Sequence, residues 1–411
     1  MNIVILTIIL PYPLDSGGAQ AQYNMIDRLR FNHNITIVFP ENEMNKMSAL
    51  DELKKRWPQV EFCPYRYANQ LINPCFLFSK IKRAFKKTVM PNNERFIVER
   101  MLKPYGYSMD WRFVRFFNNV IKEKAADIVQ IEFYPYLHFV NKLPAGIRKI
   151  FIHHEIRYIR NRRLLADINL KPSEKAYMEQ LYRQEIEDLN KYDAVVALTE
   201  IDKKELLDNG VEVPLYASPA SINSELLEYE NWNGKITFLG GYGHTPNQEG
   251  FEWLVKSVVP LVDWSKYPNT EIQIVGGGWP QTVESLTNLV KIKRMGFVEN
   301  LTSVAKNSIM IVPILSGSGM RMKILEGAAM GMPIITTAVG VEGIDFEHKK
   351  TCMIVNSAED FAESLMQVMS NQNLRIQLTT EARKKFIEKY SIDATAKIRE
   401  NIYCSLNNDR K

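Results

Sequence analysis

The sequence has few cysteines and no long apolar run, and each shortage excludes a class of protein. The four cysteines in 411 residues are Cys63, Cys75, Cys352 and Cys404, with no Cys-x-x-Cys pair. This spacing excludes a disulfide scaffold and favours a reducing compartment. No apolar stretch approaches the roughly 20 residues that span a bilayer. The net charge of +5 is too small to indicate a nucleic-acid partner. We therefore expect a cytoplasmic protein.

Several catalytic motifs are also missing. The chain has no His-Glu-x-x-His zinc pattern, no Gly-x-Ser-x-Gly nucleophile turn and no Walker Gly-Lys-Ser/Thr loop. It has no Asp-x-Asp pair that would hold a metal–diphosphate complex, so we expect neither a metal site nor a cofactor. The apolar run Ile3–Leu10 lacks a basic start and meets Pro11 at once, which is typical of a first strand and not of a signal peptide. It also lacks Gly-x-Gly-x-x-Gly, which disfavours a nicotinamide site.

Strand-like runs alternate with longer helical patterns, which favours parallel sheets with crossover helices. In the first half the predicted strands are Ile3–Leu10, Ile35–Phe39, Ile128–Glu132, Lys149–His153 and Ala194–Leu198, and the predicted helices are Ala21–Arg30, Met47–Arg56 and Lys175–Lys191. The stretch 213–233, rich in Pro, Ser and Asn, predicts the crossing between two domains.

The same alternation restarts at Lys235. The predicted strands are Ile236–Leu239, Glu271–Val275, Val290–Met295, Ile309–Pro313, Pro333–Thr336 and Met353–Val355, and the predicted helices are Gln248–Val259, Gln281–Leu289, Lys323–Met330, Ala358–Ser370 and Asn373–Glu388. We therefore predict an α/β protein with two doubly wound, Rossmann-like parallel-sheet domains, 1–215 and 216–390, facing across a cleft. A C-terminal helix within 391–411 could pack back on the first domain.

The most informative segment is 309–336. An apolar run predicts a strand, a Gly/Ser turn follows, and the next helix carries Arg321 and Lys323 in its first turn. The turn residues are Gly317, Ser318 and Gly319. The amino end of a helix suits an anion, and two cations beside it suit a diphosphate. Glu326, further along the helix, could accept hydrogen bonds from a ribose diol. The alternative is a salt-bridged surface helix with Lys323 and Glu326 three residues apart.

Two other glycine loops follow predicted strands. Gly17 and Gly18 come after the first strand and precede a helix, an arrangement that lets backbone approach an anionic ligand. The alternative is a tight turn that needs positive φ. Gly240 begins a similar loop in the second half, which continues through His244 and Pro246 to Asn247. That loop could close over a diphosphate.

Two further segments lie at predicted strand ends. His153 and His154 end a strand of the first half, where a histidine could polarise a hydroxyl or stabilise charge. The alternative is a buried, hydrogen-bonded histidine. Gly296 and Val298 follow a strand of the second half and could offer backbone groups to a flat base.

Residues 71–124 mix basic and aromatic side chains at helical spacing, such as Lys86 and Lys87, and later Arg112, Phe113 and Phe116. Two interpretations remain open. The segment could be an insertion that rests on an anionic membrane surface, placing the protein on the inner face of the plasma membrane. It could also contain ordinary cationic helices packed on the sheet.

Taken together, these motifs resemble the retaining glycosyltransferases of family four, which have the GT-B fold. The stretch Gly317 to Glu326 is similar to the family's Gly-Ser-Gly-x-Arg-x-Lys-x-Leu-Glu signature. The resemblance extends to Gly331-x-Pro333, to residues 340–344, to Pro246-Asn247, to residues 127–130 and to His154 with the arginines behind it. Many members carry a glutamate where this chain has Ser318, and relatives often have Glu at Arg157.

The resemblance implies roles for these residues. Arg321 and Lys323 would hold the donor diphosphate and stabilise the departing nucleotide, and Glu326 would bind the nucleotide ribose. Gly17 and Gly18 would approach the donor phosphates or the acceptor, His154 would lie near the reacting sugar, and backbone groups at Val298 would contact the base. The Gly240 and Gly317–Gly319 loops and Asn247 would complete the donor site.

The implied activity is metal-independent transfer of a hexose from a UDP- or GDP-sugar, with retained configuration, to a glycan or lipid-linked acceptor. The usual setting is biosynthesis of a bacterial surface polysaccharide. Two alternatives remain: a partner subunit of the same fold without turnover, and an enzyme resembling UDP-N-acetylglucosamine 2-epimerase.

Overall fold

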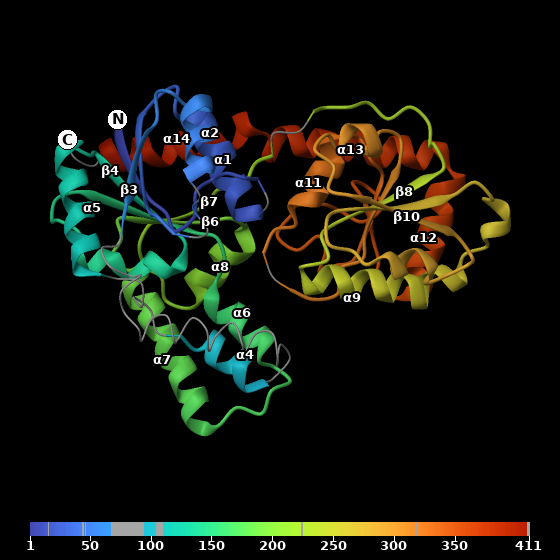
Figure 1. The fold of residues 1–411 in the computed structure, drawn as a ribbon, viewed down its shortest axis with the longest axis horizontal. Coiled ribbons are helices and arrows are strands. Elements are labelled where there is room, and N and C mark those ends of the chain that lie inside the picture. Colours follow the sequence, from blue (N-terminus) through green and yellow to red (C-terminus); the bar gives the residue numbers. More distant parts are fainter. Residues whose placement is uncertain are drawn as a thin grey trace. The chain divides into compact units, whose positions relative to one another are not determined.

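A computed structural model describes the protein at residues 1–14, 16–42, 45, 47–66, 94–103, 110–222, 225–317 and 319–408. The chain divides into two compact units. The first contains Met1–Ser218 and Ala396–Lys411, and the second contains Pro219–Thr395. Each unit is built on one parallel sheet covered by helices, so the prediction of two Rossmann-like domains is confirmed (Figure 1).

The first unit has a seven-stranded sheet in the order β3-β2-β1-β4-β5-β6-β7, and every pair is parallel. Its strands are β1 Asn2–Leu6, β2 Asn34–Pro40, β3 Glu61–Tyr65, β4 Ile128–Glu132, β5 Arg148–His153, β6 Ala194–Ala197 and β7 Leu215–Ala217. Alternate residues of a strand face opposite sides of the sheet. Thus Ile3 and Ile5 enter one apolar core, while Val4 and Leu6 enter the other.

Helices cover both faces of this sheet. They are α1 Gly17–Leu29, α2 Met47–Arg56, α4 Glu94–Met101, α5 Trp111–Glu123, η1 Tyr134–Lys142, α6 Arg157–Leu164, α7 Pro172–Leu189, α8 Glu200–Asp208 and α14 Ile392–Asn408. The helices α1, α2 and α14 share one core with the sheet, and α5 and η1 share the other. Figure 1 shows α14 in red beside α1 and α2 in blue. In α14, Ala396, Ile402, Tyr403 and Leu406 belong to that shared core.

The second unit has a six-stranded sheet in the order β10-β9-β8-β11-β12-β13, again with every pair parallel. Its strands are β8 Lys235–Leu239, β9 Glu271–Val275, β10 Lys291–Gly296, β11 Ile309–Val312, β12 Ile334–Thr336 and β13 Met353–Ile354. Ile309 and Ile311 face the core beneath α9 (Thr245–Trp253) and α12 (Ala358–Ser370). Met310 and Val312 face the core beneath α11 (Met322–Ala329) and α13 (Gln372–Lys389).

The helices of the second unit include three short irregular pieces between α9 and β9. They are α9 Thr245–Trp253, η2 Leu254–Val258, η3 Val259–Leu261, η4 Trp264–Lys266, η5 Gln281–Ser285, α10 Thr302–Ala305, α11 Met322–Ala329, α12 Ala358–Ser370 and α13 Gln372–Lys389. The predicted helix over 248–259 is thus an α-helix that continues as a π-helical turn.

The structure differs from the sequence-based elements in a few places. β1 ends at Leu6, four residues earlier than predicted, because the Thr7 hydroxyl donates to the Ile9 carbonyl and turns the chain. The helix predicted over Gln281–Leu289 is a short 3₁₀ segment. It is tied to β10 by Glu284, whose carboxylate accepts the Arg294 N–H at 2.8 Å.

Two strands were not predicted, β3 and β7, and both lie at the edges of the first sheet. Edge strands can be short and can contain proline because one side has no ladder to complete. β3 contains Pro64, and β7 is three residues long within the stretch predicted to be a domain crossing.

Residues 71–124 are described only in part, and Lys86 and Lys87 lie outside the described residues. In the described helix α5, Phe113 and Phe117 are fully buried in the core, so packing on the sheet accounts for these aromatic side chains. None of the helices that the structure describes is long and apolar enough to cross a membrane.

Candidate functional site

Two groups of predicted residues lie where the strand order of each sheet reverses. In a doubly wound sheet the connections turn to opposite sides at this point, and ligands bind beyond the carboxyl ends of the strands there. In the first unit this point lies between β1 and β4, and in the second it lies between β8 and β11.

In the second unit, Lys323 joins the loop after β8 to the helix after β11. Its ammonium donates to Asn247 Oδ1 at 2.8 Å, and the Asn247 amide nitrogen donates to the Gly241 carbonyl at 2.9 Å. No side chain would fit at position 240, because a Cβ on Gly240 would lie 2.6–2.8 Å from the side-chain amide atoms of Asn247. The predicted residues Gly240, Asn247 and Lys323 are therefore in one cluster.

Arg321 stands at the amino end of α11, in the N-cap position. A guanidinium has only donors and cannot cap the first-turn N–H groups, so this helix end presents positive charge. The side chain is buried, donates to the Gly319 carbonyl and passes close to Gly317. Gly317 and Gly319 have φ of 105° and 82°, which other residues rarely adopt.

The electrostatics of this cluster are unfavourable for a second positive charge. The pKa of Lys323 is lowered to about 7, first by burial and then by the neighbouring Arg321 charge, while Glu326 opposes the shift. The pKa of His244 is lowered by burial and then by the charges of Lys323 and Arg321. A bound anion would relieve this repulsion, so the geometry suits an anionic ligand.

The remaining predicted residues of this unit have less direct placements. Glu326 lies in the second turn of α11, half-buried, with its charge felt at Lys323. Val298 follows β10, the edge strand, and is separated from β8 by β9, so the sheet order sets it apart from the cluster. Ser318 lies outside the described residues.

The salt-bridged surface helix considered as an alternative does not describe α11. Five of its eight residues are buried: Ile324, Leu325, Gly327, Ala328 and Ala329. The helix is therefore a core element whose amino end alone reaches the candidate site.

In the first unit, His154 lies just after β5 and pairs with Glu132, the last residue of β4. The His154 Nε2 to Glu132 Oε2 distance is 2.5 Å, and the two side chains are 11% and 4% exposed. The imidazole also stacks on Phe133, with ring centroids 4.0 Å apart and an angle of 15° between the planes. The orientation of the His154 ring is thus fixed by two contacts, the stacking of its face on Phe133 and the contact of Nε2 at its edge with Glu132.

The paired glycines form the first turn of α1, which begins at Gly17 and is capped by the Ser16 hydroxyl. Neither glycine has positive φ, so the tight-turn alternative is wrong. A Cβ on Gly18 would lie 3.0 Å from the ring of Phe133, the ring that stacks on His154. The structure therefore brings Gly18 and His154 together through Phe133.

Phe133 has φ of 69°, a backbone conformation that is strained for a residue with a side chain. Such strain, of about 1–3 kcal/mol, gathers at functional sites. The sequence analysis did not single out Phe133 or its neighbour Glu132. The signal was the alternation of β4, where Gln130 and Glu132 take positions that apolar residues occupy in adjacent strands.

His153 has a different environment from His154. Its Nε2 lies 3.0 Å from Glu185 Oε1, and both side chains are 1% exposed. The alternative of a buried, hydrogen-bonded histidine thus describes His153.

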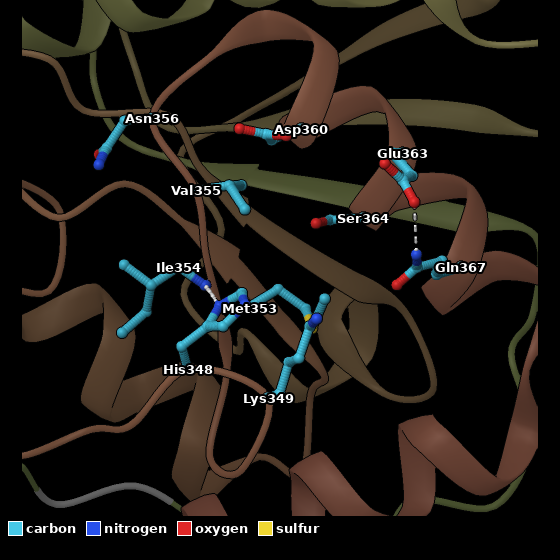
Figure 2. Close-up of a pocket in the computed structure, with 10 residues that line it drawn as sticks. All are labelled: His348, Lys349, Met353, Ile354, Val355, Asn356, Asp360, Glu363, Ser364 and Gln367. Atoms are coloured by element: carbon cyan, nitrogen blue, oxygen red, sulfur yellow. Dashed lines mark hydrogen bonds between the residues drawn. The ribbon is translucent and has the colours of Figure 1, made fainter.

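A cavity of about 360 Å³ lies in the second unit beside the edge strand β13 (Figure 2). It is lined by residues 348–349 and 353–356 and by Asp360, Glu363, Ser364 and Gln367 of α12. None of the predicted site residues lines it. Among the described residues, no group of three or more His, Cys, Asp or Glu side chains could hold a metal ion.

Comparison with known proteins finds a family match within the second unit. Residues 233–371 match the family model described as Glycosyl transferases group 1. A protein of Klebsiella pneumoniae described as an uncharacterized 44.6 kDa protein in the cps region is 24% identical over 153 residues, which cover 35% of this chain. The match spans about two fifths of that protein's length, 39%.

Solved structures resemble the whole chain. A glycosyltransferase from Rickettsia africae covers 98% of both chains with 17% identity and a TM-score of 0.62. Sucrose-phosphate synthase from Thermosynechococcus elongatus covers 98% of both chains with 14% identity and a TM-score of 0.68. HepE from Anabaena, in complex with UDP, covers 98% of this chain and 100% of its own, with 11% identity and a TM-score of 0.68. The chain therefore has the GT-B fold, and its second unit carries a glycosyl transferases group 1 domain.

Proposed function

We propose that the protein is a retaining glycosyltransferase that moves a hexose from a nucleotide-diphosphate sugar to a glycan or lipid-linked acceptor without a metal ion. The observation that carries this proposal is the pair of cations at the amino end of α11, the buried Arg321 and the half-buried Lys323. The matched family domain contains both residues. HepE, which shares the fold, was crystallised with UDP and with UDP-glucose.

The proposed roles follow from the charges and their positions. In a retaining transfer the leaving diphosphate gains negative charge as the sugar departs, and it takes the acceptor's proton on the same face. Arg321 and Lys323 would stabilise that charge, and each preorganised donor of this kind contributes about 2.7–4 kcal/mol to the transition state. Glu326 would bind the ribose, and His154 would contact a hydroxyl of the sugar.

Nucleotide release from UDP- and GDP-sugars by the purified protein tests this function. We expect Arg321→Ala and Lys323→Ala each to lower turnover by about a hundredfold or more. Matched controls are Arg383→Ala, which removes a donor to the Leu227 carbonyl, and Lys385→Ala, which removes the partner of Asp345 in the same unit. Both controls are expected to keep full turnover. Equal turnover in all four variants would contradict the proposal.

The same assay separates the alternatives. An epimerase would convert UDP-N-acetylglucosamine without an acceptor and would exchange a hydrogen of the sugar with solvent. A partner subunit would bind the nucleotide sugar without turnover. Turnover in excess chelator and a product whose anomeric proton shows the donor's configuration are the results expected of the proposed transferase.

A further inference from the structure

A chain of buried polar side chains runs from the C-terminal helix to His154 within the first unit. The Tyr403 hydroxyl donates to Gln130 Oε1 at 2.5 Å. The Gln130 amide donates to Glu132 Oε1 at 2.5 Å, and Glu132 Oε2 lies 2.5 Å from His154 Nε2. Tyr403, Gln130 and Glu132 are 0%, 2% and 3% exposed. The chain is therefore shielded from water along its length.

The donors and acceptors of this chain follow from its Tyr403 end. Burial raises the pKa of Tyr403 to about 12, so its hydroxyl keeps the proton that it donates. The Gln130 oxygen, which also faces Arg399 Nη1 at 3.4 Å, is then an acceptor, and its amide nitrogen is a donor. Glu132 receives hydrogen bonds at both oxygens, because a carboxylate is an acceptor only. With Glu132 ionised, the short contact between Glu132 Oε2 and His154 Nε2 requires the proton to lie on Nε2.

The other ring nitrogen of His154 has a different environment. Nδ1 is buried and makes no hydrogen bond with any residue that the structure describes. It belongs to the ring that stacks on Phe133, beside the first turn of α1. With Nε2 turned to Glu132, Nδ1 is the nitrogen left to meet a substrate hydroxyl.

Stability alone does not explain this polar chain. Gln130 and Glu132 occupy the row of β4 that faces the apolar core, opposite Ile5, Ile150 and Ile152 of the neighbouring strands. Well-packed apolar residues at such positions are often as stable as a buried polar network, or more stable. A role in orienting the functional side chain of His154 would explain why Gln130 and Glu132 are polar.

We propose that Tyr403, Gln130 and Glu132 are positioning residues that hold His154 in its Nε2–H form and direct Nδ1 toward the substrate. The proposal rests on the proposed function for the role of His154, and it extends that function to a helix more than 200 residues later in the chain. The outer partner of a functional histidine sets its tautomer and its orientation in this way in other sites.

The test compares Tyr403→Phe with a matched variant, Tyr192→Phe, in the full chain. Tyr192 is also buried in the first unit, and its hydroxyl donates to the Leu137 carbonyl at 2.6 Å, outside the polar chain. The protein is labelled with ¹⁵N-histidine, and the His154 signal is assigned by its loss in His154→Gln. We expect Tyr403→Phe to shift the His154 Nε2–H resonance and to leave that of His153 unchanged. Tyr192→Phe is expected to leave His154 unchanged.

A second pair of variants tests the carboxylate. Glu132→Gln is expected to move the His154 resonance, and Glu185→Gln to move that of His153 only. In the transfer assay we expect Tyr403→Phe and Glu132→Gln to lower kcat by about tenfold to a hundredfold, the range seen when an outer partner of a ligating histidine is removed. KM for the nucleotide sugar is expected to stay within about twofold, since uniform binding is unchanged.

Two results would overturn the proposal: a wild-type His154 protonated on Nδ1 alone, or identical His154 resonances and kcat values in Tyr403→Phe and Tyr192→Phe. If Tyr403→Phe does not fold, Gln130→Met interrupts the same chain and carries the same expectations. Should the wild type transfer no sugar from any donor, the proposed function fails, and the histidine resonances still decide whether the polar chain sets the tautomer of His154.

Discussion

Binding of a nucleotide sugar is expected to depend on the protonation of Lys323. Its pKa is lowered to about 7 by burial and by Arg321, so the ammonium is only half-charged at neutral pH. A diphosphate in contact with it would favour the charged form and raise the pKa toward its ordinary value. Binding would therefore take up a proton, and affinity would fall as the pH rises above 7.

The size of the effect follows from the charged fraction of Lys323. With a pKa of about 7, that fraction is roughly 0.76 at pH 6.5 and roughly 0.03 at pH 8.5. If only the charged form binds the diphosphate, Kd rises by the inverse of the fraction, or about 25-fold between these two pH values. Burial and the charges of Lys323 and Arg321 lower the pKa of His244, which moves its titration toward more acidic pH than this range.

Isothermal titration calorimetry with a nucleotide sugar is the suitable assay. Each phosphate of the ligand's diphosphate is substituted on both sides, so the charge of the ligand stays constant over this pH range. The perturbation is Lys323→Arg, which keeps a charge at every pH because a guanidinium does not lose its proton in proteins. We expect this variant to show a flat pH profile. Lys323→Met, which has no charge to lose, is expected to be flat as well and to bind more weakly than the wild type even at pH 8.5.

The matched control is Lys385→Met, which removes a lysine of the same unit that pairs with Asp345. It is expected to keep the 25-fold dependence worked out above. A wild-type Kd that changes by less than about threefold between pH 6.5 and 8.5 would show that the Lys323 ammonium is not coupled to the ligand.

Two further predictions concern stability. The folded-state pKa of Lys323 lies below its unfolded value, so the charged lysine is penalised in the fold below pH 7, and the penalty is removed as the pH rises toward 10.5. Lys323→Met is therefore expected to increase the free energy of unfolding at pH 6.5 by a few kcal/mol, which is about 1.4 kcal/mol per pKa unit less about 1 kcal/mol for the lost hydrogen bond. This gain is expected to disappear near pH 10. Denaturant titration at both pH values measures it, and a destabilised variant at pH 6.5 would contradict the prediction. Gly250→Ala is expected to lower the free energy of unfolding by about 3 kcal/mol or more, because its Cβ would lie 2.1 Å from the Pro313 carbonyl oxygen. The control Gly243→Ala, whose Cβ meets nothing within 4 Å, is expected to change it by less than about 0.5 kcal/mol. Equal unfolding midpoints for the two variants would show that the contact of α9 with Pro313 is not tight.

The central elements of both sheets could be predicted from the sequence because their physics is local. A central parallel strand is apolar on both faces, and it therefore appears as a short apolar run between helical patterns. β6 and β11 are examples, with every residue apolar and buried. The edge strands β3 and β7 were missed because one side faces no partner, which relaxes both composition and length. The positive-φ glycines of the turn before α11 were also visible as a sequence motif.

The surroundings of each candidate site required the tertiary structure. The adjacent residues His153 and His154 look equivalent in the sequence, yet one is paired with Glu185 and the other with Glu132. The sequence likewise indicated two cations on α11 but not that Asn247, 76 positions away, would accept from Lys323. Such pairings depend on which strands become neighbours and on which side of a strand each residue faces.

By itself the sequence determined the alternation of strands and helices and the position of the cationic turn after β11, since periodicity and turn chemistry act over a few residues. The contact of Tyr403 with β4 required the tertiary structure, because Tyr403 is 273 positions from Gln130 in the sequence. Contacts across that separation are selected by the packing of a whole unit, because burying polar groups is tolerated only where their partners arrive together.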